Sequence, residues 1–119
     1  MFVRCTFFRG RVKSGLQEEF DRTVEEMLVP LQVRFPGAEE VRVLRQAESD
    51  TEDPRFEMVL ALRYPSMEAI ERALASEVRA RSRELTQKLL AMFDGDIFHT
   101  VFRAGEHAII GDIVAGHPA

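Results

Sequence analysis

Few side chains in this sequence could do chemistry, and His99 is the strongest candidate among them. It lies in the middle of an apolar segment, IFHTVFR, with Phe98 before it and Thr100 after it. An imidazole in an apolar cavity can act as a base or hydrogen-bond a ligand, because it changes charge near neutral pH. The alternative is a core histidine whose ring is satisfied by a backbone carbonyl or a water molecule. We take His99 as the candidate catalytic residue.

Three further side chains are candidates for binding a ligand. Tyr64, the only tyrosine, ends a predicted strand, where the rims of pockets lie, although packing at the following turn explains it equally well. Arg4 and Arg42 project from predicted strands, so each can pair with an acidic ligand or with Glu57 across a dimer. For these two arginines the ion pair is the preferred interpretation.

The other reactive residues favour structural roles. Cys5 is expected to be a buried thiol rather than a nucleophile, because it lies mid-strand on an apolar face. His99, His107 and His117 lack the spacing of a zinc site. The acidic segment 48–54 lacks the glycine and the terminal glutamate of a calcium loop, so it is expected to be a solvated hairpin tip. We therefore expect no metal, heme or flavin.

Charge and composition exclude several classes of partner. The chain has 16 basic and 20 acidic residues and a net charge of −4, which argues against nucleic-acid binding. The segment 79–83, RARSR, is basic, but the i,i+4 pairs Glu77–Arg81 and Glu84–Lys88 are typical of a solvated helix face. The apolar runs are too short to span a membrane. One cysteine allows no intrachain disulfide, so we expect a cytoplasmic protein.

The segment 55–75 is the one around which the rest of the chain is organised. It begins with the apolar run 56–62, which is typical of a strand buried on both faces. Pro65 ends that strand, because proline has no N–H to donate to the sheet. Ser66 is a good N-cap for an amphipathic helix that follows directly.

The remaining elements are predicted from periodicity and turn residues. Ser14 and Gln17 have the spacing of a capping box at the start of the first helix, and Pro30 should kink that helix near Glu26. A second helical segment should begin at Ser76. The predicted elements are strand 2–8, basic loop 9–13, helix 14–35, edge strand 39–47, the central strand and helix, helix 76–93, and strand 97–103.

The order β-α-β-β-α-β predicts a ferredoxin-like α+β fold, an antiparallel sheet with both helices on one face. The other face is left bare and carries either Phe2 and Phe8 or Phe98 and Phe102. An apolar patch of that size normally marks an interface, so we expect a homodimer that pairs the two sheets face to face.

The tail should form a separate arm. Residues 1–103 complete the expected domain, and residues 104–119 carry four β-branched apolar side chains among three glycines. Because these side chains need cover, we expect the arm to pack on the partner subunit; packing back on its own subunit is the main alternative. The four side chains are Ile109, Ile110, Ile113 and Val114.

Two stretches resemble known families. EEFDRTVEEMLVPLQVRFPGAEEVRVL is similar to EthD-like proteins, and FEMVLALRYPSMEAIERALAS resembles a segment shared by EthD-like, antibiotic-monooxygenase-like and stress-responsive A/B-barrel proteins. The resemblance spans about residues 1–103 and implies the dimeric α+β-barrel superfamily. The histidine that often precedes VPL in EthD-like proteins is Leu28 here, and the chain has no tryptophan or asparagine. The family's catalytic residues therefore do not carry over.

The resemblance implies a small-molecule-binding protein, and the candidate activity is that of a cofactor-independent oxygenase or related enzyme acting on an apolar or aromatic metabolite. The alternative is a non-catalytic binding module, or a dimeric interaction module. Whether the chain catalyses a reaction is left open by its residues.

Overall fold

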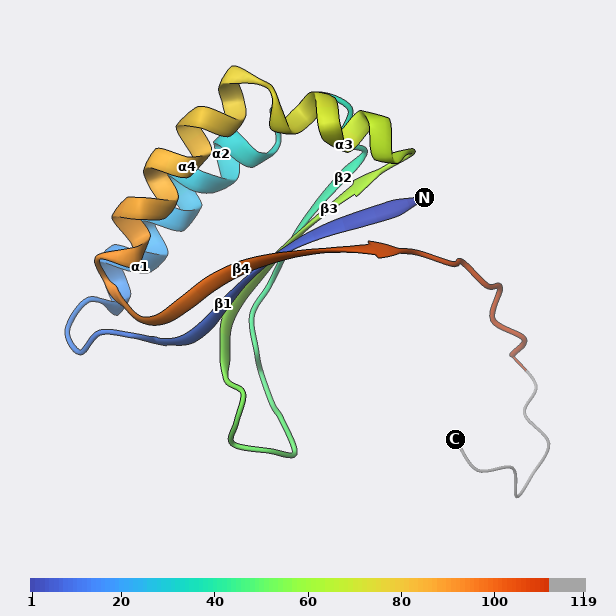
Figure 1. Cartoon of the computed structure of the whole chain (residues 1–119). Coiled ribbons are helices and arrows are strands. Elements are labelled where there is room, and N and C mark those ends of the chain that lie inside the picture. Colours follow the sequence, from blue (N-terminus) through green and yellow to red (C-terminus); the bar gives the residue numbers. More distant parts are fainter. Residues whose placement is uncertain (112–119) are drawn as a thin grey trace.

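The computed structural model describes residues 1–111 and shows a four-stranded antiparallel sheet with helices on one face (Figure 1). The strands lie in the order β2-β3-β1-β4, so β1 and β3 are central and β2 and β4 are the edges. This arrangement confirms the predicted ferredoxin-like α+β fold. The strands are β1 (Phe2–Val12), β2 (Glu40–Leu44), β3 (Phe56–Tyr64) and β4 (Phe93–Arg103).

The core lies between the sheet and the helices. Alternate residues of β3 point toward the helices, and these are buried: Met58, Leu60, Leu62 and Tyr64. On the neighbouring strand, Phe8 is fully buried and makes edge-to-face contacts with Phe20 and Phe93. The predicted central strand is therefore confirmed as the middle of the sheet.

The helices after the central strand begin where the serines predict. Ser66 caps α3 (Met67–Leu74) by accepting a hydrogen bond from the Ala69 N–H at 3.1 Å. Ser76 caps α4 (Glu77–Leu90) in the same way, accepting from the Arg79 N–H at 3.3 Å. The predicted break between the two helical segments is therefore confirmed.

The first helical segment differs from its prediction. It consists of α1 (Gln17–Thr23), the π-helical turn η1 (Val24–Leu28) and α2 (Val29–Gln32). The expected capping box is wrong, because the helix starts at Gln17 without a side-chain cap. Pro30 has no N–H to donate to the Glu26 carbonyl, and the wider turn lies in the chain just before it.

Two strands are longer than predicted. The basic segment after Phe8 is mostly strand, because β1 pairs with β4 as far as Val12 opposite Phe93. Gly10 pairs with Gly95 within this extension, and both have positive φ angles, 135° and 156°. A Cβ atom on Gly10 would collide with the Asp94 carbonyl, so only glycine allows the two backbones to approach here.

The helix-free face carries an aromatic cluster. Phe7 stacks on Phe98 with ring centroids 4.9 Å apart, and it also contacts Phe56 and Phe102. Phe102 is 47% exposed. Of the two alternatives from the sequence, the pair Phe98 and Phe102 is right, and Phe2 and Phe8 face the helices instead.

The tail continues from β4 without further secondary structure to residue 110. Ala104 N–H donates to the Met1 carbonyl at 3.0 Å, and the chain then extends away from the sheet (Figure 1). Ile109 and Ile110 are 93% and 82% exposed, so they do not pack back on their own subunit. Ile113 and Val114 lie outside the described residues.

The glycine pair gives a stability prediction. Gly10→Ala should lower the free energy of unfolding by at least about 3 kcal/mol, because it adds a backbone collision to an unfavourable φ angle. Gly15→Ala is the matched control: its φ angle is also positive, at 83°, but its Cβ would meet nothing within 4 Å. That change should cost only about 1 kcal/mol. If urea titrations show an equal loss of unfolding free energy in the two variants, the collision with the Asp94 carbonyl is contradicted.

Candidate functional site

A cavity of about 300 Å³ lies between the sheet and α4. Its volume is at the lower end of the range for small-molecule sites. The sheet side of the cavity is formed by Arg4, Thr6, Leu60, Leu62, Tyr64 and His99. The helix side is formed by Arg79, Ser82, Arg83, Thr86, Gln87 and Leu90.

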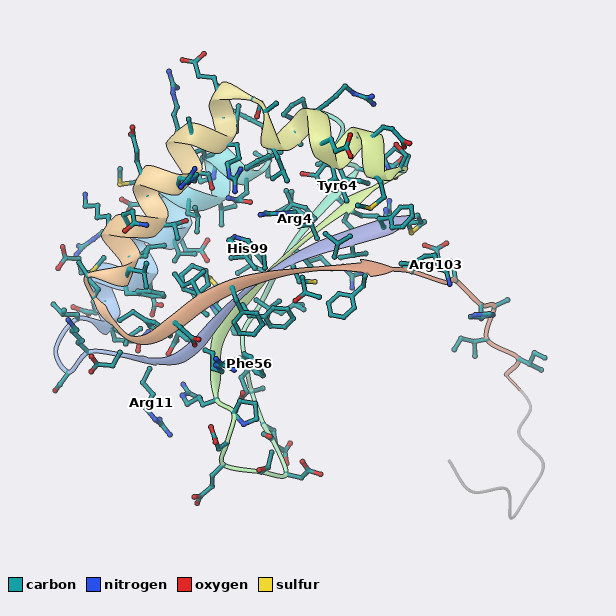
Figure 2. The ribbon with its side chains drawn as sticks, in the orientation of Figure 1. Arg4, Arg11, Phe56, Tyr64, His99 and Arg103 are labelled. Carbon is teal, nitrogen blue, oxygen red and sulfur yellow. The ribbon has the colours of Figure 1, made fainter. Side chains whose placement is uncertain are left out.

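Strand alternation brings the sheet residues together. Thr6 of β1 lies directly opposite His99 of β4, and Arg4 lies two residues away on the same face of β1. Tyr64 comes from the end of β3, where it is 1% exposed. Figure 2 shows Arg4, Tyr64 and His99 on the helix-covered side of the sheet, and Phe56 on the other side. Three of the four predicted site residues therefore line one cavity.

Arg42 is not part of this site. It projects from the opposite face of β2, where its Nε is 2.8 Å from Glu40 Oε1 and its side chain is 67% exposed. Glu57, the partner considered from the sequence, is already engaged by Arg45 at 3.5 Å and by Arg55 at 3.4 Å in the same protomer.

Sequence analysis missed the helix side of the cavity. Arg79 and Arg83 were assigned to a solvated face, but both line the cavity, as does Ser82 between them. Arg81 and Arg83 are both exposed, as that assignment predicts, and the Arg81 side chain, 66% exposed, lies 3.9 Å from Glu77. The available signal was the polar stripe at 79, 82, 83, 86 and 87, which has helical spacing but differs from the apolar stripe of the same helix.

A buried hydrogen bond between α2 and α4 holds α4 in its position over the sheet. Gln32 Nε2 of α2 donates to Ser82 Oγ at 2.8 Å, and the two residues are only 5% and 8% exposed. A buried polar pair of this kind is costly to break, because each group would lose its partner away from water. The pair therefore fixes one wall of the cavity.

The charged side chains that line the cavity are all positive. Partial burial, and then the charges of Arg4 and Arg79, lower the pKa of His99 to about 4. The residue remains exposed on the edge strand, so solvent screens part of this effect, but the imidazole is neutral at pH 7 in either case. Burial, and then Arg79, also lower the pKa of Arg4, while burial raises the pKa of Tyr64.

These groups define what the cavity can do. A neutral imidazole can accept a proton or a hydrogen bond, the guanidinium groups can stabilise negative charge on a bound molecule, and the protonated Tyr64 hydroxyl can donate. Within residues 1–111, no group of three or more His, Cys, Asp or Glu side chains is arranged to hold a metal ion. In the same residues no helix is both long and apolar enough to cross a membrane.

Cys5 lies on the other side of β1 from this cavity. It is 8% exposed, and burial raises the pKa of its thiol. Its position next to Arg4 in an alternating strand turns it toward the helix-free face. The structure is thus consistent with a structural thiol.

Comparison with solved structures identifies the fold. An EthD-family protein from Bacillus halodurans is 16% identical, with a TM-score of 0.71 over 88% of this chain and 100% of that chain. A Methanosarcina mazei protein is 14% identical, with a TM-score of 0.63 over 88% and 94% of the two chains. An antibiotic biosynthesis monooxygenase is 15% identical, with a TM-score of 0.60 over 89% and 100%.

The chain therefore has the α+β fold shared by EthD-family and antibiotic biosynthesis monooxygenase structures, which is the fold that the two sequence stretches predict. At these identities the likeness concerns the fold alone. The sequence matches no protein-family model and no curated protein.

The charge environment of His99 can be measured directly. The NMR signal of its ring should titrate with a midpoint at a pH of about 4. Because an unfolded histidine takes up its proton at about 6.5, this group lowers the stability of the fold as the pH falls below that value. Arg79→Gln should raise the midpoint by removing a positive charge, and Arg81→Gln should leave it unchanged. A wild-type midpoint at about 6.5 would show that burial and the positive charges of the cavity do not lower the pKa of His99.

Proposed function

We propose that this protein binds a small, apolar or aromatic molecule in the cavity between its sheet and α4. The observation that carries the proposal is the convergence of His99, Tyr64 and Arg4 on one cavity from three different strands. In this assignment His99 is the base or the orienting group, and Arg4 and Tyr64 contact the ligand.

We further propose that the bound molecule is a substrate, and that the reaction is of the cofactor-independent oxygenase type. His99 is unprotonated at the working pH, as a general base has to be; with a pKa of about 4 it is a weak base, so proton removal would depend on the guanidinium groups beside it. The neighbouring guanidinium groups would stabilise the anion left after proton removal. The antibiotic biosynthesis monooxygenase of similar fold is in keeping with such chemistry.

We also propose a homodimer that pairs the two helix-free faces, in the cytoplasm, with residues 1–103 as the domain and the arm beyond them packed on the partner. The aromatic cluster on that face supports this arrangement, because Phe102 and the edge-strand residue Leu44 are 47% and 48% exposed in the single protomer. Apolar side chains gathered on one face normally mark an interface.

The role of His99 can be tested by thermal shift with a library of aromatic metabolites. The free energy of unfolding of His99→Ala should lie within about 1 kcal/mol of the wild-type value, because the side chain borders a cavity. The variant should, however, lose the increase in melting temperature that a bound ligand causes in the wild type. His107→Ala, the same change at an exposed site in the tail, is the control and should keep the shift. A loss of stability of about 1–3 kcal/mol in His99→Ala would assign the residue to the core instead.

The same library separates an enzyme from a binding module. Oxygen uptake on addition of a compound that binds, absent in His99→Ala, is the result expected for the oxygenase. Binding without oxygen uptake or any change in the compound would support the binding module.

The dimer can be tested by light scattering after size exclusion. The wild type should have about twice the 13.6 kDa chain mass at micromolar concentration. Phe102→Glu should shift it toward the monomer by placing a charge in the interface, and removal of residues 105–119 should raise the dissociation constant by about tenfold or more. Met27→Glu is the control, because Met27 is equally exposed, at 45%, but lies on the helix side. A monomeric wild type would refute the interface.

A further inference from the structure

We infer that the ligand of this cavity is an anion, and specifically a carboxylate carried on an apolar body, held by Arg4, Arg79 and Arg83. The inference rests on the proposed function, because it assumes that the cavity is the ligand site. It goes further by assigning the chemical class of the ligand from the charges that surround it.

Arg4 and Arg79 are half-buried in the cavity, and Arg83 lines the cavity but is exposed. Arg55 and Arg63 are also half-buried, and each lies within 4.0 Å of a carboxylate. Within residues 1–111, no carboxylate lies at ion-pair distance from Arg4, Arg79 or Arg83, and no Asp or Glu lines the cavity. The cavity therefore concentrates positive charge in a chain whose net charge is −4.

This concentration costs free energy when the cavity holds no anion. Arg4 is partly removed from water and faces the charge of Arg79, and both effects lower the pKa of Arg4. Arg79 Nη1 has one protein acceptor nearby, the Leu74 carbonyl at 3.4 Å, which leaves its remaining donors available. A bound anion would remove the repulsion and supply the missing acceptors, as a carboxylate does for half-buried arginines elsewhere in the fold.

Guanidinium groups bind carboxylates and phosphates alike, so it is the apolar lining of the cavity that favours a carboxylate on an apolar body over inorganic phosphate. The planar guanidinium fork matches the two oxygens of a carboxylate, and two such forks lie one helical turn apart on α4 at Arg79 and Arg83. The rest of the lining includes Leu60, Leu62, Leu90, Ile97 and Phe35, which suit an apolar ring system. A volume of about 300 Å³ fits an aromatic acid of one or two rings.

His99 and the arginines would have different roles toward the ligand, because His99 is neutral. The same guanidinium charges that would hold the carboxylate disfavour the imidazolium form. His99 therefore keeps its acceptor nitrogen, while the arginines hold the charge. The ligand would be fixed by its carboxylate at one end and presented to the imidazole by the apolar walls.

The experiment compares a carboxylate with its neutral isostere. Isothermal titration of the full-length wild-type protein with 2-naphthoate and with 2-naphthamide should show binding that is tighter for the carboxylate by about tenfold or more. The double variant Arg79→Gln/Arg83→Gln should lose that advantage and bind the two compounds alike.

The matched control changes the same number of charges on the other face of α4. Arg81→Gln/Lys88→Gln removes two positive charges beside a groove that opens away from the cavity, so it should keep the wild-type preference for 2-naphthoate. An independent readout is the NMR titration of His99: 2-naphthoate should raise its midpoint by neutralising nearby guanidinium charge, and 2-naphthamide should not.

Several outcomes would overturn the inference. Equal affinity for acid and amide in the wild type would refute anion selection while leaving the cavity as a ligand site. An equal loss in the control variant would show that net charge, rather than these arginines, is responsible. Binding of inorganic phosphate without 2-naphthoate, or of neither, would refute the carboxylate assignment; the screen of neutral aromatic compounds then decides the proposed function separately.

Discussion

The position of α4 over the sheet decides whether this fold contains a site at all. Its apolar stripe, which includes Leu85 and Leu89, packs into the core and against the first helical segment. The stripe turned toward β1 and β4 is made of polar and charged residues instead, and such side chains cannot fill a dry core without partners. The Gln32–Ser82 hydrogen bond supplies one such partner and holds the helix in place. The cavity is the space left between the sheet and the polar side of α4, which do not pack tightly against each other.

Much of the fold follows from local sequence signals. The apolar run 56–62, Pro65 and the two serine caps determine a strand, a turn and the starts of two helices, and the structure has all of them. Strand extension was not predictable in the same way. The pairing of Gly10 with Gly95 depends on the approach of two backbones that are distant in the sequence, and each glycine alone is typical of a loop.

The candidate site was predictable only in part, because alternation determines which residues of one strand share a face, whereas the register between strands comes from the tertiary structure. Strand alternation placed Arg4 and His99 on a single face once the register was known, and Tyr64 closes the same face. Arg42 was misassigned because an alternating edge strand gives no indication of which face the helices cover. Arg79 and Arg83 were missed because charge pairs at i,i+4 suggest solvent, and only the tertiary position of α4 distinguishes Arg81 from its neighbours.

The single tyrosine gives the protein an optical property of its own. Tyr64 is 1% exposed and lines the cavity, and the chain has no tryptophan. Tyrosine emission from the whole molecule therefore originates at one wall of the candidate site, next to the Arg4 guanidinium. A colourless compound entering the cavity would change the polarity and the quenching around that one phenol. Occupancy can thus be followed in the unmodified chain, without a dye, a label or an engineered reporter.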